Sequence, residues 1–116
     1  MSQVEKPINK SLRVSEDVII EIIANAAMEV DGVAAIARRK KNPTRLLTNN
    51  KNTRAIKIEL RGDVLAVRLG VILRNGAKAV GTAEKIQDKV KSSVQSMLSL
   101  TVTKVDVNVV NVLSEE

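Results

Sequence analysis

Few residues of this 116-residue chain have a type and spacing that could carry chemistry, and the first group lies at residues 76–82, GAKAVGT. Gly76 and Gly81 are spaced as in the phosphate-binding loop of nucleotide hydrolases. That loop needs a lysine after its last glycine to reach the terminal phosphates, and here Thr82 follows Gly81 directly. We therefore interpret the segment as a turn followed by the start of a helix.

A second group places Lys89 and Lys91 beside Ser92 and Ser93, a combination that could form a serine–lysine dyad. The surrounding sequence contains neither the strained turn nor the oxyanion hole that would activate such a nucleophile. We interpret these four residues as part of a solvated helix face.

The third group is Asp17 and Glu21, which are one helical turn apart and could hold a hydrated divalent cation. Acidic residues in a first helical turn mostly complement the helix dipole, so we predict no metal site. The absence of Cys and His excludes a thiolate nucleophile, a disulfide, an imidazole base and the usual zinc ligands. The absence of Phe, Tyr and Trp removes the rings on which single-stranded bases stack. The sequence thus predicts a non-enzymatic protein without cofactor or small-molecule substrate.

The formal net charge of +6 is concentrated in one part of the chain. Residues 38–54, which we call the basic segment, contain seven basic residues and no acidic one, whereas residues 14–37 contain five acidic residues and no basic one. The polarity of the basic segment and Pro43 indicate a loop. Its candidate contact residues are Arg38, Arg39, Lys40, Lys41, Arg45, Leu46, Leu47, Lys51 and Arg54.

Three interpretations of the basic segment stay open. It can be a solvated loop that adds charge for solubility. It can bind the phosphates of nucleic acid or the headgroups of anionic lipid, and Leu46 and Leu47 favour lipid or a protein groove. It can also contact the acidic first helix of another copy in a head-to-tail assembly. The candidate docking residues on that helix are Asp17, Glu21 and Glu29.

Two amphipathic helices are predicted. The first runs from Ser15 to Val33, with Ser15 as its N-cap and Gly32 as the left-handed residue after its last turn. The second runs from about Ala79 to Leu98. Their apolar stripes are Val18, Ile19, Ile22, Ile23, Ala26, Ala27 and Val30 in the first helix, and Ala83, Ile86, Val90, Val94 and Met97 in the second.

Five strands are predicted around these helices, at about residues 11–14, 33–37, 56–61, 64–74 and 101–113. The turn Gly62-Asp63 joins two of them as a hairpin. The order β-α-β-β-β-α-β predicts an α+β fold, a two-layer sandwich with two helices on one face of a mixed β-sheet. The strands at 64–74 and 101–113 could be parallel neighbours in a crossover unit.

The chain is predicted to form a single domain at residues 11–113, with tails at 1–10 and 114–116. No apolar run of roughly 18 residues occurs, and the first ten residues are polar. The sequence therefore predicts neither a membrane span nor a signal peptide, and a cytoplasmic protein by default.

The sheet face without helices is the predicted oligomer face. On this side the strand at 64–74 presents Val64, Ala66, Arg68, Gly70, Ile72 and Arg74. This set is too apolar for a surface in contact with water, which indicates that another copy or a partner covers it. Arg68 and Ile72 are its candidate contact residues.

The wording of both helices and of the last strand is more specific than their secondary structure requires. The specific features are the Ser-acid-Val start at Ser15, Ala26-Ala27 before Glu29-Val30, Gly32-Val33, Ile86-Gln87, the stripe Val90/Val94/Met97, and Val105-Asp106-Val107-Asn108-Val109. Together they resemble the alkaline shock protein family of Gram-positive bacteria, also called the Asp/Gls-type envelope stress response family.

The resemblance implies a small cytoplasmic protein without catalytic activity that responds to envelope or alkaline stress. It implies self-association, and as a partner a membrane-anchored protein that holds the chain near the membrane. Other family members are linked to control of fatty-acid precursor synthesis, so regulation of such an enzyme is an alternative. The resemblance transfers no catalytic or cofactor-binding residue.

Overall fold

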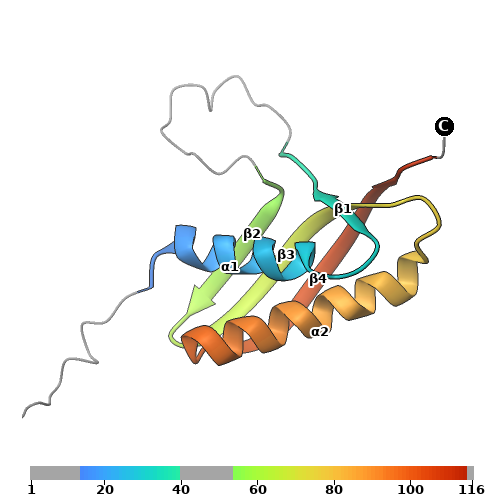
Figure 1. Cartoon of the computed structure of the whole chain (residues 1–116). Helices are drawn as coiled ribbons and strands as arrows, with labels where there is room; N and C mark the ends of the chain where they lie inside the picture. The colour runs from blue at the N-terminus through green and yellow to red at the C-terminus, as the bar shows by residue number, and fades with distance from the viewer. Residues whose placement is uncertain (1–13, 40–53, 115–116) are drawn as a thin grey trace, which may run out of the picture.

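The computed structural model describes residues 14–39 and 54–114. Its elements are α1 (Glu16–Met28), β1 (Val33–Ile36), β2 (Ile56–Arg61), β3 (Val64–Leu73), α2 (Ala79–Leu98) and β4 (Thr101–Val112) (Figure 1). The strand expected at residues 11–14 lies outside the described residues except for Val14, which is in no strand. The expected tail at 1–10 and the last two residues also lie outside them.

β3 is the central strand of the sheet. One of its edges pairs with two short strands end to end, β2 along Val64 to Leu69 and β1 along Val71 to Leu73, both antiparallel. Its other edge pairs in parallel with β4 over its whole length. The sheet is therefore mixed, and the expected crossover from β3 through α2 to β4 is confirmed.

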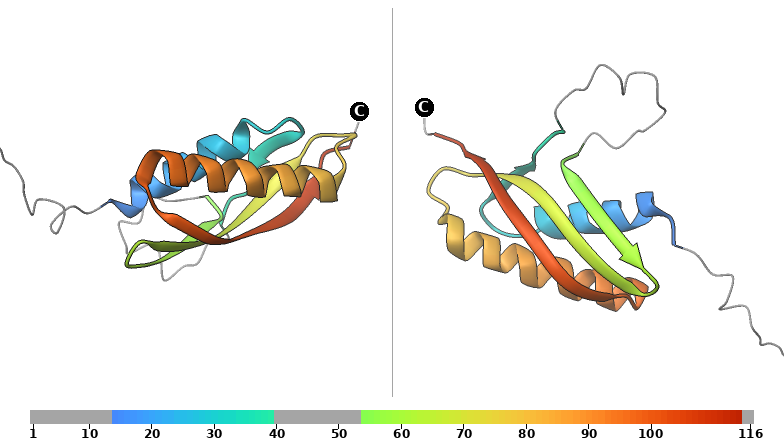
Figure 2. Two further views of the ribbon diagram at one scale, coloured as in Figure 1. Left: turned by 90° about the horizontal axis from the view of Figure 1, so that it is seen from below. Right: turned by 180° about the vertical axis from the view of Figure 1, so that it is seen from behind.

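Both helices lie on one face of this sheet, and the opposite face is left without a helix (Figure 2). Alternate residues of β3 point toward the helices because successive side chains of a strand lie on opposite faces. These are Leu65, Val67, Leu69, Val71 and Leu73, all buried, and they join Ile19, Ile23, Ile86, Val90 and Val94 of the helices in one core. The predicted two-layer α+β sandwich is confirmed.

The first helix is shorter than predicted and buries a wider face. Ser15 caps it as expected, since its Oγ accepts a hydrogen bond from the Asp17 N–H at 3.1 Å. The helix ends at Met28, so Gly32, at a φ of +102°, belongs to the turn before β1 and not to the last helical turn. Ile20 is buried, whereas Val18 of the predicted stripe is 46% exposed. The buried arc is wide because α1 packs against both the sheet and α2.

The second helix begins and ends where predicted. Its buried residues repeat every fourth position, at Thr82, Ile86, Val90 and Val94. Met97, predicted to be buried, is 66% exposed, and the core contact of the last turn is made by Leu98 instead. Leu98 continues the four-residue repeat from Val94, while Met97 is turned away from it.

Candidate functional site

The uncovered sheet face is built from alternate residues of three strands. The register places Lys57, Glu59 and Arg61 of β2, Val64, Ala66, Arg68, Gly70 and Ile72 of β3, and Lys104, Asp106, Asn108 and Asn111 of β4 on it. Among the described residues no helix crosses this face (Figure 2). We call it the open face, and it divides into a charged half and an apolar half.

The charged half surrounds an ion pair between β3 and β4. Arg68 Nε lies 3.5 Å from Asp106 Oδ2, and both side chains are largely exposed. Lys57, Glu59 and Lys104 stand around this pair and line a shallow hollow of about 240 Å³. Exposed ion pairs contribute little to stability, so this half supplies charges of both signs without rigidly binding them together.

The apolar half is centred on Gly70 and Ile72. A Cβ atom at Gly70 would lie 3.1 Å from Val110 Cγ2, 3.4 Å from Ala37 Cβ and 3.5 Å from Ala55 Cβ, so these three side chains gather over the glycine. Ile72 is half-buried beside them. We call Ala35, Ala37, Ala55, Gly70, Ile72 and Val110 the apolar patch.

The register explains how Ala35 and Val110 come to join this patch. Ala35 of β1 pairs with Ile72 after a shift in the register, which brings its side chain to the same face. A second shift, between Val71 and Ile72, leaves Val110 unpaired in β4. Val110 is 55% exposed, so the patch contains an aliphatic side chain that is in contact with water.

Both residues predicted for the oligomer face lie on the open face. Arg68 is in the charged half and Ile72 in the apolar patch. Arg74 is placed differently from the prediction, because its Nε donates a hydrogen bond to the Val33 carbonyl at 3.4 Å and is held toward β1. The contact role of Arg68 and Ile72 stays a prediction.

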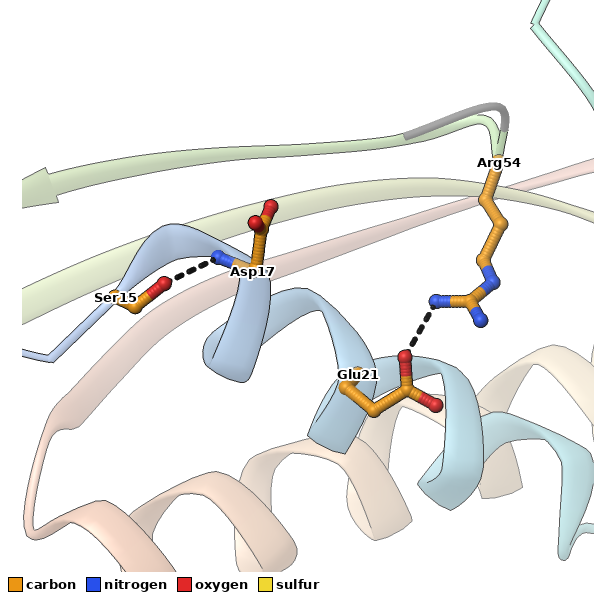
Figure 3. Close-up of polar contacts among 4 residues, drawn as sticks. All are labelled: Ser15, Asp17, Glu21 and Arg54. Atoms are coloured by element: carbon orange, nitrogen blue, oxygen red, sulfur yellow. Dashed lines mark hydrogen bonds and ion pairs between the residues drawn. The ribbon is translucent and has the colours of Figure 1, made fainter. Parts of the chain in front are cut away.

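The acidic residues of α1 form ion pairs within the chain (Figure 3). Glu21 Oε1 accepts a hydrogen bond from Arg54 Nη1 at 3.0 Å, and Glu29 Oε1 lies 3.1 Å from Lys89 Nζ of α2. The carboxylate of Asp17 points away from that of Glu21. No cluster of acidic residues able to hold a metal ion occurs in the described part of the chain.

The basic segment leaves and rejoins the sheet at one place. Arg38 and Arg54 form an isolated antiparallel bridge, so its two ends are adjacent. Lys40, Lys41, Arg45, Leu46, Leu47 and Lys51 lie outside the described residues. The contact between opposite charges that we expected between copies occurs within one chain at Arg54.

The other two candidate groups adopt the simple interpretations. Gly76 is in a turn at a φ of +89°, and Thr82 is buried in the first turns of α2, as expected for a turn and helix start. Ser92 Oγ donates to the Lys89 carbonyl at 3.3 Å. Because the Lys89 ammonium pairs with Glu29, it is directed away from this hydroxyl.

Sequence reasoning missed Val110 and two glutamines of α2. Val110 follows Val109 at the point where the alternation of the last strand stops, and this break was the available signal for a register shift. Gln95 Oε1 accepts from the Val102 N–H at 3.1 Å, and Gln87 Nε2 donates to the Val105 carbonyl at 3.0 Å. Both glutamines reach the backbone of β4, a contact for which periodicity has no signal.

Comparison with known proteins gives a consistent result. The profile of the alkaline shock protein family, described as having a cell envelope-related function, matches residues 4–114. A Streptococcus pyogenes protein called Spy1614 is 27% identical over 104 residues, covering 87% of this chain and 86% of its own. The Bacillus subtilis protein YloU is 26% identical over 99 residues, covering 83% and 82%.

The fold also resembles solved structures. One structure of a MamM CTD variant matches 84% of this chain and 98% of its own with a TM-score of 0.53 at 13% identity. Another matches 82% and 94% with a TM-score of 0.51 at 14% identity. At such low identity the likeness concerns the fold alone. In the described residues, neither helix has the length and hydrophobicity that crossing a membrane requires.

Proposed function

Since the chain belongs to the alkaline shock protein family, whose function is cell envelope-related, we propose that it is a non-enzymatic interaction module of the envelope stress response. It acts in the cytoplasm near the membrane, by associating with itself and with a membrane-anchored protein. The observation that supports this proposal most is the open face, where Ile72 and Val110 lie on a sheet surface that no helix among the described residues covers.

The composition of the open face supports a protein as its partner. Interfaces combine an apolar centre with a polar rim, and here an apolar patch adjoins a charged half that carries Arg68 and Asp106. An apolar patch of this kind on a soluble domain generally marks an interaction site. A second copy is a suitable partner, because the charged half holds both signs and can meet its own equivalent.

The non-enzymatic part of the proposal rests on the side chains available. The sequence has no Cys and no His. The serines and lysines that could have formed a dyad are engaged elsewhere, Ser92 with a carbonyl and Lys89 with Glu29. The function therefore depends on surfaces and not on a reacting group.

Replacing Ile72 with lysine tests the proposal. We expect self-association to weaken at least about 30-fold, because a central interface residue contributes about 2 kcal/mol or more and a lysine there buries a charge. Ile72 points away from the core, so the circular dichroism spectrum should be retained. A sedimentation series over protein concentration measures the effect.

Val80→Lys is the matched control, since Val80 is 74% exposed on α2, in the helix layer. It introduces the same change outside the open face and should leave association unchanged. A wild-type protein that sediments as a monomer at every concentration would contradict self-association. Loss of the circular dichroism signal by Ile72→Lys would place Ile72 in the core.

We also propose a second candidate function, binding to an anionic surface through the basic segment. It is supported by the bridge between Arg38 and Arg54, which brings the cations at the two ends of the segment together. Several cations at one place can neutralise phosphates of nucleic acid or of lipid headgroups, with an affinity that falls as salt rises.

Neutralising residues 38–41 to glutamine tests this second candidate. If the segment binds anions, retention on DNA or on vesicles with anionic lipid should fall with salt. On DNA, the slope of log affinity against log salt should decrease by roughly 0.9 for each phosphate that the variant no longer neutralises. Neutral vesicles are the control, and DNA and anionic vesicles distinguish the two sources of phosphate. Retention that is insensitive to salt or to the substitutions would contradict anion binding.

A further inference from the structure

β4 is the outer strand of the sheet. It pairs with β3 along one edge from Thr101 to Val112, and its other edge has no strand beside it among the described residues (Figures 1 and 2). An outer strand of 12 residues is long, and it contains no proline. Such an edge offers unpaired N–H and C=O groups to another strand unless it is blocked.

The two glutamines of α2 show which backbone groups face outward. Gln87 donates to the Val105 carbonyl, which places that carbonyl on the outer edge. Successive residues of a strand direct their backbone groups to opposite edges, so those of Val107 and Val109 also face outward. Gln95 occupies the outer edge at Val102, near the start of the strand. The edge from Val107 onward lies beyond the reach of these two contacts.

The sequence around Val107 is close to a palindrome. The segment Val105-Asp106-Val107-Asn108-Val109 has valine at its centre and both ends, with a carboxylate and a carboxamide between them. When two copies run antiparallel with Val107 opposite Val107, valine meets valine and Asp106 meets Asn108. The carboxamide can donate to the carboxylate, and no like charges face each other.

We propose that β4 pairs with β4 of a second copy, antiparallel about a two-fold axis at Val107, which joins the two sheets into one. The inference rests on the proposed self-association and names a second surface for it, separate from the open face. The occupant is a second copy because the segment is complementary to itself. The exposed side chain of Gln87 releases the Val105 carbonyl, which then accepts from the N–H of Val109 of the other copy.

A single cysteine tests both the pairing and its register. In a hydrogen-bonded antiparallel pair the Cα atoms are about 5.5 Å apart, inside the range of about 4.4–6.8 Å for a disulfide. The chain has no cysteine of its own, so any disulfide of Val107→Cys joins two copies. We expect most of this variant to become a disulfide-linked dimer under mild oxidation, measured by non-reducing electrophoresis.

Val105→Cys and Val109→Cys are matched controls on the same edge. Each would be about 14 Å from its equivalent in the other copy, too far for a disulfide. The double variant with both cysteines should cross-link, because residue 105 lies opposite residue 109. Cross-linking of Val105→Cys without Val107→Cys would overturn the register, and equal cross-linking of all variants would indicate random collision.

Failure of this inference and failure of the proposed function can be told apart. If Ile72→Lys weakens association but Val107→Cys gives no dimer, the open face is the interface and the edge proposal is wrong. If Val107→Cys cross-links and Ile72→Lys associates like the wild type, the edge proposal holds and the open face is not an interface. If the wild type is monomeric and no variant cross-links, both are wrong, and the edge is left to a strand of another protein.

Discussion

Replacing Leu69 with alanine should lower the free energy of unfolding by about 2–5 kcal/mol, measured by urea denaturation. Leu69 has no exposed surface and lies at the middle of β3, between Ile56 of β2 and Val107 of β4, beneath the helices. Removing its side chain leaves a cavity that neither paired strand can close. Since domains of this size are stabilised by about 5–15 kcal/mol, the variant should be largely unfolded at moderate temperature.

Ile72→Ala is the matched control on the same strand. It removes a similar volume from the open face, where Ile72 is only half-buried, so the loss should be less than half that of Leu69→Ala in dilute protein. An equal loss for both variants would show that β3 is buried on both faces within one copy. That result would remove the open face as a candidate site, so the pair tests the site as well as the core.

The two faces of β3 could be predicted because the alternation of its side chains has a period of two and extends over ten residues. The bounds of α2 were equally accessible, as a strand ends before it and Ser99 stops it in the left-handed conformation. The burial of Ile20 instead of Val18 was not predictable. It depends on the position of α2 beside α1, and a periodic pattern on one helix contains no information on its neighbours.

The candidate site was predictable only where a single strand forms it. Arg68 and Ile72 follow from the alternation of β3, whereas Ala37, Ala55 and Val110 reach the apolar patch through pairing with distant strands. The shift that exposes Val110 changes which face a side chain occupies, and a slip of one residue has this effect in any sheet.

The ion pairs show the same limit of sequence reasoning. Arg54 and Glu21 are 33 residues apart in the chain, so their opposite charges could be noted but not their contact. The sequence permitted a contact between copies as well as one within a copy, and the folded chain forms the second at this pair.

Replacing Gly32 with alanine should destabilise the protein by about 3 kcal/mol, through two causes that add. The φ of +102° is a conformation that residues with a Cβ rarely adopt, at a cost of about 1–3 kcal/mol. The new Cβ would also lie 3.2 Å from Ala77 Cβ and 3.4 Å from Thr82 Oγ1, so the start of α2 must move. Urea denaturation measures the loss.

Gly76→Ala separates these two causes. Gly76 has a similar φ of +89°, but nothing lies within 4 Å of the position its Cβ would take, so this variant should show the backbone cost alone. The difference between the variants then measures the packing of the α1–β1 turn against α2. Equal losses would mean that Ala77 and Thr82 yield without cost. The Gly32 carbonyl accepts the Arg74 N–H at 2.7 Å and so fixes β1 against β3. Gly32→Ala should therefore also displace Ala35 in the apolar patch and weaken self-association, while Gly76→Ala should leave association unchanged.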